Sequence, residues 1–220
     1  MRKPDSLPMI PEISIESLDL STALSYLGKD DDDKSWSRFD NYHRNALLRL
    51  QAIGVDFALI ASNTPHHRFA PIVAGIRIPV LSIFDAVARA SAQVGASEVL
   101  ILGTPITMTS ASLRQAFKSN GIAAFGPKDD TQREMTVSLI GDLQRGKTQG
   151  SAQRLVEIAR SSIAHALYAK PAVCLACTEL PLVFEQHRLQ ETLEYDGFRF
   201  INSTIVHVET ALDFAFGGEA

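Results

Sequence analysis

A cysteine directly follows an apolar run in the second half of the chain. Residues 172–176 are Ala-Val-Cys-Leu-Ala, a pattern typical of a buried strand, and Cys177, Thr178 and Glu179 come next. Thr178 and Glu179 suit the first turn of a helix. At such a junction a thiol meets unpaired backbone N–H groups and the positive end of a helix dipole, which both favour the thiolate. The pattern therefore predicts a lowered pKa for Cys177 and a role in proton transfer. A buried, unreactive cysteine is the alternative interpretation.

The first half of the chain contains a second copy of this pattern. The apolar stretch 57–61 ends at Ser62, which is followed by Asn63, Thr64 and Pro65, and proline suits a first helical turn. Two such strand–loop–helix units facing each other would place two proton-handling groups on opposite sides of one cleft. A serine hydroxyl is a much weaker acid than a thiol and needs a neighbouring base. A small residue that only fits the turn is the alternative for Ser62.

The elements that must position these residues alternate between strands and helices. Hydrophobic patterning predicts strands at 9–16, 57–61, 79–82, 98–102, 122–125, 172–176 and 198–201. It predicts helices that end near 53 and 95, and others over 107–118, 129–143, 150–168 and 204–216. This alternation predicts an α/β protein with mainly parallel sheets.

The repeated motif predicts two similar, pseudo-symmetric three-layer lobes with the active site in the cleft between them. We expect the first lobe over residues 1–88 and the second over 89–203. The C-terminal helix, residues 204–220, is expected to pack back on the first lobe.

Composition and charge narrow the classes of function. Hydrophobic residues make up 45% of the chain and charged residues 21%, as in ordinary globular proteins. A net charge of −4 gives no basic surface for nucleic acid, and no apolar run has membrane-spanning length. Cys174 and Cys177 give no disulfide framework and no metal-ligand spacing, so we expect a reducing, cytoplasmic location and no metal. Cys174 lies inside the predicted strand, which favours a buried filler over a redox partner of Cys177.

Taken together, these motifs resemble those of the aspartate/glutamate/hydantoin racemase family. Its members pair a Cys-Asn-Thr-x-His motif with a Cys-Thr-Glu motif, which stand here as Ser-Asn-Thr-Pro-His at 62–66 and Cys-Thr-Glu at 177–179. Further matches are Leu102-Gly103-Thr104…Thr107, Gly146-Lys147 and Asn202-Ser203-Thr204…His207. The resemblance implies a homodimeric racemase of aspartate or glutamate that needs no cofactor, neither pyridoxal phosphate nor metal.

The resemblance also implies roles for individual residues. Inversion of a carbon requires a base on one face and an acid on the other. Cys177 and Ser62 fall at the family's two acid/base positions, and Lys147 falls at a basic position that meets the distal carboxylate in aspartate-type relatives. The residues implied in substrate binding are Asn63, Thr64, Thr178, Thr104, Thr107 and Lys147, and those implied in support are Glu179, His66 and His207. Asn63 and Thr178 as simple helix caps, and Lys147 as a solvated loop residue, are the alternatives.

Two departures from the family pattern leave other functions open. Ser62 stands where most members have cysteine, and the chain begins at what resembles the family's second strand, without the glycine-rich loop that follows the first. The alternatives are a single-cysteine decarboxylase or cis–trans isomerase of a small dicarboxylate, and a degenerate protein that only binds small acids. In each case the expected partner is a small molecule, an amino acid or a dicarboxylate.

Overall fold

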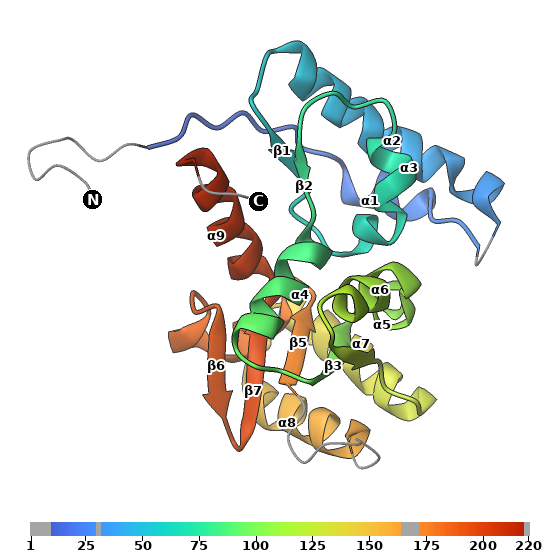
Figure 1. Ribbon diagram of the computed structural model, residues 1–220. Coiled ribbons are helices and arrows are strands. Elements are labelled where there is room, and N and C mark those ends of the chain that lie inside the picture. Colours follow the sequence, from blue (N-terminus) through green and yellow to red (C-terminus); the bar gives the residue numbers. More distant parts are fainter. Residues whose placement is uncertain (1–9, 30–31, 164–171, 218–220) are drawn as a thin grey trace, which may run out of the picture.

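Two β-sheets organise the computed structural model, which describes residues 10–29, 32–163 and 172–217 (Figure 1). The larger sheet has the strand order β4-β3-β5-β7-β6. Its strands are β3 (Glu98–Gly103), β4 (Ala123–Phe125), β5 (Ala172–Ala176), β6 (Thr192–Tyr195) and β7 (Phe198–Asn202). All neighbours are parallel except β6 and β7. The smaller sheet pairs β1 (Ala58–Leu59) with β2 (Val80–Leu81) in parallel. The predicted α/β fold with mainly parallel sheets is confirmed.

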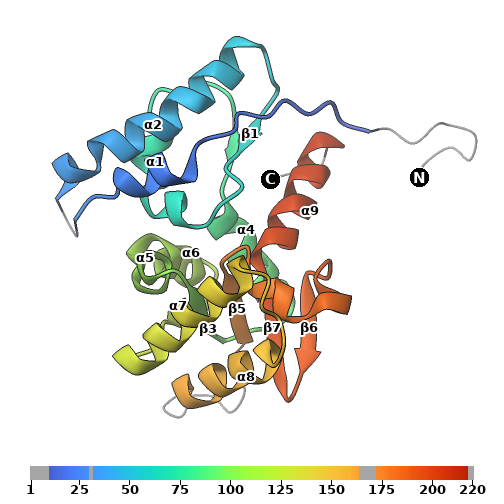
Figure 2. The same ribbon diagram turned by 180° about the vertical axis from the view of Figure 1, so that it is seen from behind.

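Helices cover both faces of the larger sheet, so its central strands β3 and β5 are buried along their whole length. One face packs against α4 (Ile83–Gln93), α6 (Ala111–Ser119) and α9 (Ser203–Ala215). The other packs against α7 (Asp130–Gln144) and α8 (Ser151–Ser162), as the two views of the molecule show (Figure 2). Side chains of a strand alternate between faces, so Val99 and Ile101 enter the first core while Leu100 and Leu102 enter the second.

The smaller sheet carries its own core, built on α2 (Asp33–Ala52). Trp36, Phe39 and Leu47 of this helix pack with Ala58 of β1 and Ile72. The short elements α1 (Leu20–Ser25), η1 (Thr64–Arg68) and α3 (Phe69–Val73) complete this part of the molecule. This sheet serves to hold the loop that follows β1.

The strand predicted over residues 9–16 is wrong for its described part. Residues 10–16 form no strand, and Ile10, Ile13 and Ile15 are 81%, 78% and 83% exposed. Alternating apolar residues form a strand only beside a neighbour that accepts their backbone hydrogen bonds. No described strand lies there, so the two sheets differ in size and the first has only two strands.

Other boundaries follow the predictions closely. The helix predicted over 107–118 is divided into α5 (Pro105–Thr109) and α6, because Ser110 ends the first and caps the second. Strand β6 was not predicted. Residues 1–9, the predicted end of a helix at 164–168 and the last three residues of the 204–220 segment lie outside the described residues.

Helix α9 connects the two sheets. It packs on α4, while His207 donates from Nε2 to the carbonyl of Leu81 in β2 at 3.1 Å. Phe214 meets the ring of Phe57 edge-on, with 4.9 Å between centroids. A division after residue 88 would cut α4, whose buried side chains belong to the core of the larger sheet, so the two-lobe boundaries stay a prediction.

Candidate active site

The predicted site residues gather at the carboxyl ends of the parallel strands. Thr104 follows β3, Cys177 follows β5, Ser203 follows β7, and the Ser62 loop follows the end of β1. Ligands of open α/β sheets characteristically bind at this edge, where the loops leave the strands. The site is therefore built from four loops that are far apart in sequence.

Side-chain hydrogen bonds fasten the Ser62 loop to the larger sheet. Asn63 donates from Nδ2 to Ser203 Oγ at 3.2 Å, and Ser203 Oγ donates to the carbonyl of Leu175 in β5 at 2.7 Å. Thr64 and Thr104 join their hydroxyls at 3.1 Å. Asn63 and Ser203 are buried, at 3% and 0% exposure, so these bonds form in a low-dielectric setting. The Ser62 loop and the strand that leads to Cys177 are thus brought together.

The threonines after β3 extend this connection into the core. Thr104 caps α5 by accepting from the backbone N–H of Thr107, and the two hydroxyls lie 2.9 Å apart. Thr107 is fully buried and Thr104 half-buried. Thr104 therefore stands between Thr64 at the site and Thr107 behind it.

Cys177 is a buried thiol that faces a carboxylate. Its side chain donates from Sγ to Glu179 Oε2 at 2.9 Å, and the residue is only 6% exposed. Burial, followed by the hydrogen bond to the Glu179 carboxylate, raises the pKa of Cys177 to about 12. The predicted lowering of this pKa is wrong. The chain after Cys177 forms a four-residue 3₁₀ turn, η2 (Leu180–Val183), so no α-helix dipole offsets the cost of a buried thiolate.

Glu179 is the shared acceptor of this cluster. It receives hydrogen bonds from Cys177, from Thr178 Oγ1 at 2.9 Å and from Gln144 Nε2 at 3.1 Å. Burial raises the pKa of Glu179, but the three donated hydrogen bonds outweigh it and the pKa is lowered overall. The resting pair is accordingly a neutral thiol beside a carboxylate.

Cys174 faces the opposite side of β5. It packs in the core with α4 and α6, whereas Cys177 packs in the core with α7 and α8. Cys174 is fully buried, and burial raises its pKa to about 12. The prediction of a buried filler is confirmed, and the two thiols cannot bridge across the sheet.

Ser62 is half-buried, and among the described residues its hydroxyl has no hydrogen-bond partner. Its main-chain carbonyl accepts from His66 Nδ1 at 2.8 Å. His66 is fully buried and stacks on Phe69 with 5.2 Å between centroids. Burial, and then the neighbouring His207, lower the pKa of His66 to about 3. His66 is therefore neutral and holds the loop, and it does not act as a base on the Ser62 hydroxyl.

Lys147 is not joined to the other predicted residues. Its side chain is 68% exposed, and its Nζ lies 3.7 Å from Asp142 Oδ1. Asp142 also pairs with Arg145 and Arg154 at 2.9 and 2.8 Å. The end of α7 does approach the site, because Gln144, its last residue, contacts Glu179.

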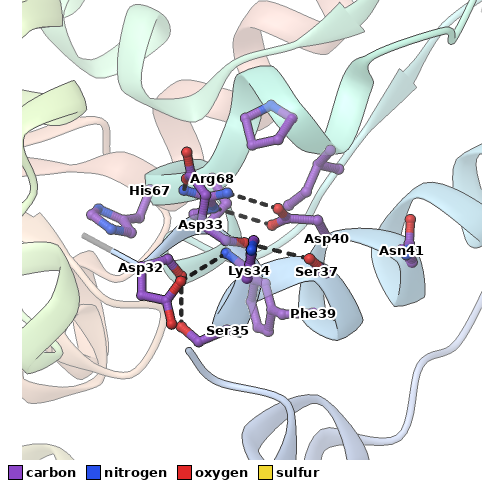
Figure 3. Close-up of polar contacts among 12 residues, drawn as sticks. Asp32, Asp33, Lys34, Ser35, Ser37, Phe39, Asp40, Asn41, His67 and Arg68 are labelled. Atoms are coloured by element: carbon purple, nitrogen blue, oxygen red, sulfur yellow. Dashed lines mark hydrogen bonds and ion pairs between the residues drawn. The ribbon is translucent and has the colours of Figure 1, made fainter. Parts of the chain in front are cut away.

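An ion pair holds η1 against α2 (Figure 3). Arg68, the last residue of η1, donates to both carboxylate oxygens of Asp40, at 3.2 and 2.9 Å, and to Asp33 at 2.6 Å. The side chains of Arg68 and Asp40 are 15% and 7% exposed, so this pair is largely shielded from water. It fixes the short helix that begins with Thr64 and thereby the end of the Ser62 loop.

Sequence reasoning gave no role to Arg68, Gln144 or Ser203. The sequence does hold a signal for Arg68, namely Asp40. This residue follows Phe39 on the buried face of α2, and a buried carboxylate requires a cation as its partner. Ser203 was noted only as part of a motif, and Gln144 carried no signal. In the part of the chain that the structure describes, no cluster of three His, Cys, Asp or Glu side chains suits a metal ion. No helix among those residues is long and apolar enough to cross a membrane.

Comparisons with known proteins agree on one family. The model of the Asp/Glu/hydantoin racemase family matches residues 18–211. An aspartate racemase homologue from Pyrococcus horikoshii OT3 superposes with a TM-score of 0.73 at 25% identity, covering 97% of this chain and 87% of the other. A Yersinia pestis protein proposed to be an Asp/Glu racemase gives 0.72 at 23% identity, covering 91% and 82%. The Picrophilus torridus aspartate racemase gives 0.62 at 22% identity, covering 80% and 69%.

Proposed function

Because this chain belongs to the Asp/Glu/hydantoin racemase family, we propose that it is an amino-acid racemase that acts on aspartate or glutamate without a cofactor. The observation that carries the proposal is the Cys177–Glu179 pair at the carboxyl end of β5, beside a loop that is hydrogen-bonded to the same strand. A thiol next to a carboxylate can give a proton away and take one back, which α-carbon inversion requires.

The pair fits proton transfer in both directions. As acid, the Cys177 thiol delivers its proton to the planar α-carbon and becomes a thiolate. As base, Cys177 first passes its proton to Glu179 Oε2, 2.9 Å away, and the thiolate then takes the α-proton of the substrate. The resting thiol already carries the proton that it delivers as acid, whereas the base direction first needs an uphill transfer, because the pKa of Cys177 is raised and that of Glu179 is lowered.

The charge that develops on the substrate carboxylate needs hydrogen-bond donors. Thr64 supplies a hydroxyl, and we assign it to this role, whereas the Thr178 hydroxyl donates to Glu179 Oε2 and would have to turn away from it to reach the substrate. The Asn63 amide donates one of its two N–H groups to Ser203, which leaves the second as a further donor. Lys147 would have to leave Asp142 to meet a distal carboxylate, and its exposed side chain is free to turn.

Ser62 is proposed as the group on the other face of the substrate. Its hydroxyl has no base among the described residues, so it returns a proton poorly and removes one more poorly still. This asymmetry supports a second candidate function, in which Cys177 alone protonates a carbanion formed by loss of carbon dioxide from a small dicarboxylate.

The decisive measurement is loss of the α-proton NMR signal in deuterated water. Each enantiomer of aspartate and glutamate is incubated with the wild-type protein, with Cys177→Ala and with Cys174→Ala as the matched control on the opposite face of β5. We expect exchange with the wild type and with Cys174→Ala, and none with Cys177→Ala. Absence of exchange on all four amino acids would reject the racemase, and consumption of a substituted malonate would then support the second candidate.

We also propose that the enzyme works as a cytoplasmic homodimer. Support comes from the family resemblance and from the two cysteines, which are both free thiols. Sedimentation equilibrium at micromolar concentration tests the dimer, and a mass of 24.0 kDa in solution would reject it.

A further inference from the structure

Three buried histidines lie where the smaller sheet meets the rest of the molecule. His43 of α2, His66 of η1 and His207 of α9 are 6%, 0% and 3% exposed. The rings of His66 and His207 meet edge-on, with 5.7 Å between their centroids. No histidine lies in the strands of the larger sheet or in α4, α6, α7 or α8. Since a histidine that is buried uncharged gains a proton as the pH falls, acid should act on the His66–His207 contact before it acts on the larger sheet.

His66 has only one nitrogen that can take up a proton. A carbonyl oxygen can only accept a hydrogen bond, so Nδ1 must carry the hydrogen that it donates to the Ser62 carbonyl at 2.8 Å. Nε2 is therefore the unprotonated nitrogen, and it is buried without a partner among the described residues. The nearby carbonyl of Leu81 favours a proton on this ring, but burial and the neighbouring His207 oppose it more strongly.

The side chains around His66 do not compensate a positive charge. It faces His207 from α9 and His43 from α2, and both would become cations themselves in acid. From α3 and α4 it faces aromatic rings. In the described part of the chain no carboxylate offsets a charge on His66 or His207, because Asp40 acts on His43 and is itself paired with Arg68.

The same two histidines hold the Ser62 loop and α9 in place. His66 binds the main chain of Ser62, and His207 joins α9 to β2 at 3.1 Å. Helix α9 runs from the end of β7 towards the smaller sheet (Figure 1). Separation of His66 from His207 would therefore also pull apart the hydrogen bond from Asn63 to Ser203, the first residue of α9.

We propose that the His66–His207 contact is an acid-sensitive switch: in weak acid the contact opens and the Ser62 loop leaves the strand ends of the larger sheet, while that sheet stays folded. The opening itself needs no assumption about activity. Its effect on catalysis rests on the proposed function of the same site.

The contact favours the closed form only while His66 is uncharged. Burial, and then His207, lower the pKa of His66 to about 3 from the ordinary 6.5, so this advantage is complete above pH 6.5 and is lost as the pH falls towards 3. Between pH 7 and 5 the equilibrium should shift towards the open form by about twentyfold. The pKa of His207 is also lowered by burial, which adds to the shift.

Hydrogen–deuterium exchange of the whole chain, followed by mass spectrometry at pH 7 and pH 5, tests the opening. After correction for the intrinsic pH dependence of exchange, protection in segments 57–81 and 203–210 should fall by about twentyfold or more. Protection of β3 and β5 should change by less than about twofold. Uniform loss across both sheets would show global unfolding in acid and overturn the proposal, and so would unchanged protection in every segment.

Variants that cannot titrate show whether these histidines are responsible. His66→Asn offers an amide N–H to the Ser62 carbonyl and His207→Gln offers one to the Leu81 carbonyl, but neither takes up a proton. Each should reduce the loss of protection at pH 5, and the double variant should remove most of it. His187→Gln, at an exposed histidine, is the matched control and should behave as the wild type. An undiminished loss in the double variant overturns the proposal, and if His66→Asn fails to fold, His207→Gln decides.

Activity measurements separate the switch from the proposed function. If the protein exchanges the α-proton of an amino acid, the rate should fall between pH 7 and 5, recover on return to pH 7, and fall less in the double variant. An equal fall in the double variant and the wild type would contradict control of the site by this contact. Absence of α-proton exchange at every pH rejects the racemase, and the protection measurements then decide the switch alone.

Discussion

The Cys177 thiol should be slow to react at neutral pH, contrary to what its position at the end of a strand suggests. Its pKa is raised to about 12 from the ordinary 9.0. At pH 8 an ordinary thiol is about one-tenth thiolate, whereas a thiol with this pKa is about one part in ten thousand. The thiolate fraction is therefore lower by about a thousandfold.

A more basic thiolate is also a better nucleophile, which offsets part of this loss. With a Brønsted coefficient near 0.4 to 0.5, a rise of about three pKa units increases the intrinsic rate by about twentyfold. We expect Cys177 to attack a small disulfide reagent at least about fiftyfold more slowly than a free cysteine at pH 8, and burial slows it further. Because the pKa lies far above the range studied, the rate should rise tenfold for each pH unit.

The assay is the release of thiopyridone from dithiodipyridine between pH 7 and 10, in a Cys174→Ala background that leaves Cys177 as the only thiol. Replacing Glu179 by Gln removes the charge that opposes the thiolate, so the rate at pH 8 should increase. Glu185→Gln, an exposed glutamate eight residues beyond Cys177, is the control. A plateau of the rate above pH 8, or a slower reaction of Glu179→Gln, would refute the reasoning and restore an activated thiolate.

Three further predictions concern the scaffold. The pKa of buried His66 is about 3 against an ordinary 6.5, so its contribution to stability is present above pH 6.5 and is lost as the pH falls towards 3. The free energy of unfolding, measured with urea, should fall by about 2 kcal/mol between pH 7 and 5. His66→Gln should flatten this pH dependence. Asp40→Asn leaves Arg68 partly unpaired in a shielded site and should lower the free energy of unfolding by about 3 kcal/mol, whereas Asp33→Asn should change it by less than about 0.5 kcal/mol because that carboxylate is 84% exposed. Gly103→Ala would place a Cβ 2.5 Å from a carbonyl oxygen of β5 and should lower the free energy of unfolding, measured by thermal unfolding, by about 1–3 kcal/mol. An unchanged stability would mean that β3 and β5 can move apart to accept the added methyl group.

Patterning predicted the larger sheet well because its strands are buried on both faces. The run 172–176 has no polar residue, and β5 occupies those same residues. Strand β6 escaped notice because Thr192 to Tyr195 carries one charged residue and lies at an edge, where burial is partial and the pattern is weak. The strand predicted over residues 9–16 was wrong for the opposite reason: its isoleucines alternate, but no neighbouring described strand covers them.

The candidate site was predictable in its members and less so in its electrostatics. Cys177, Ser62, Asn63 and Thr64 could be named from residue types at the ends of strands. The pKa of Cys177 could not, because it depends on burial against α7 and α8 and on whether a helix or a 3₁₀ turn follows. Ser203 could not be found either, since its role appears only when three chain segments meet.

The electrostatics of the two acid/base positions bear directly on the direction of catalysis. Cys177 holds a proton and lies within hydrogen-bond distance of Glu179, but its raised pKa and the lowered pKa of Glu179 make transfer of this proton to the carboxylate uphill. The Ser62 hydroxyl needs a neighbouring base to act, and His66, whose Nδ1 donates to the Ser62 main-chain carbonyl, is neutral. Proton removal by Cys177 is therefore easier than removal by Ser62. It follows that the enantiomer whose α-proton faces Cys177 should exchange its proton faster than it inverts, and the opposite enantiomer should react more slowly.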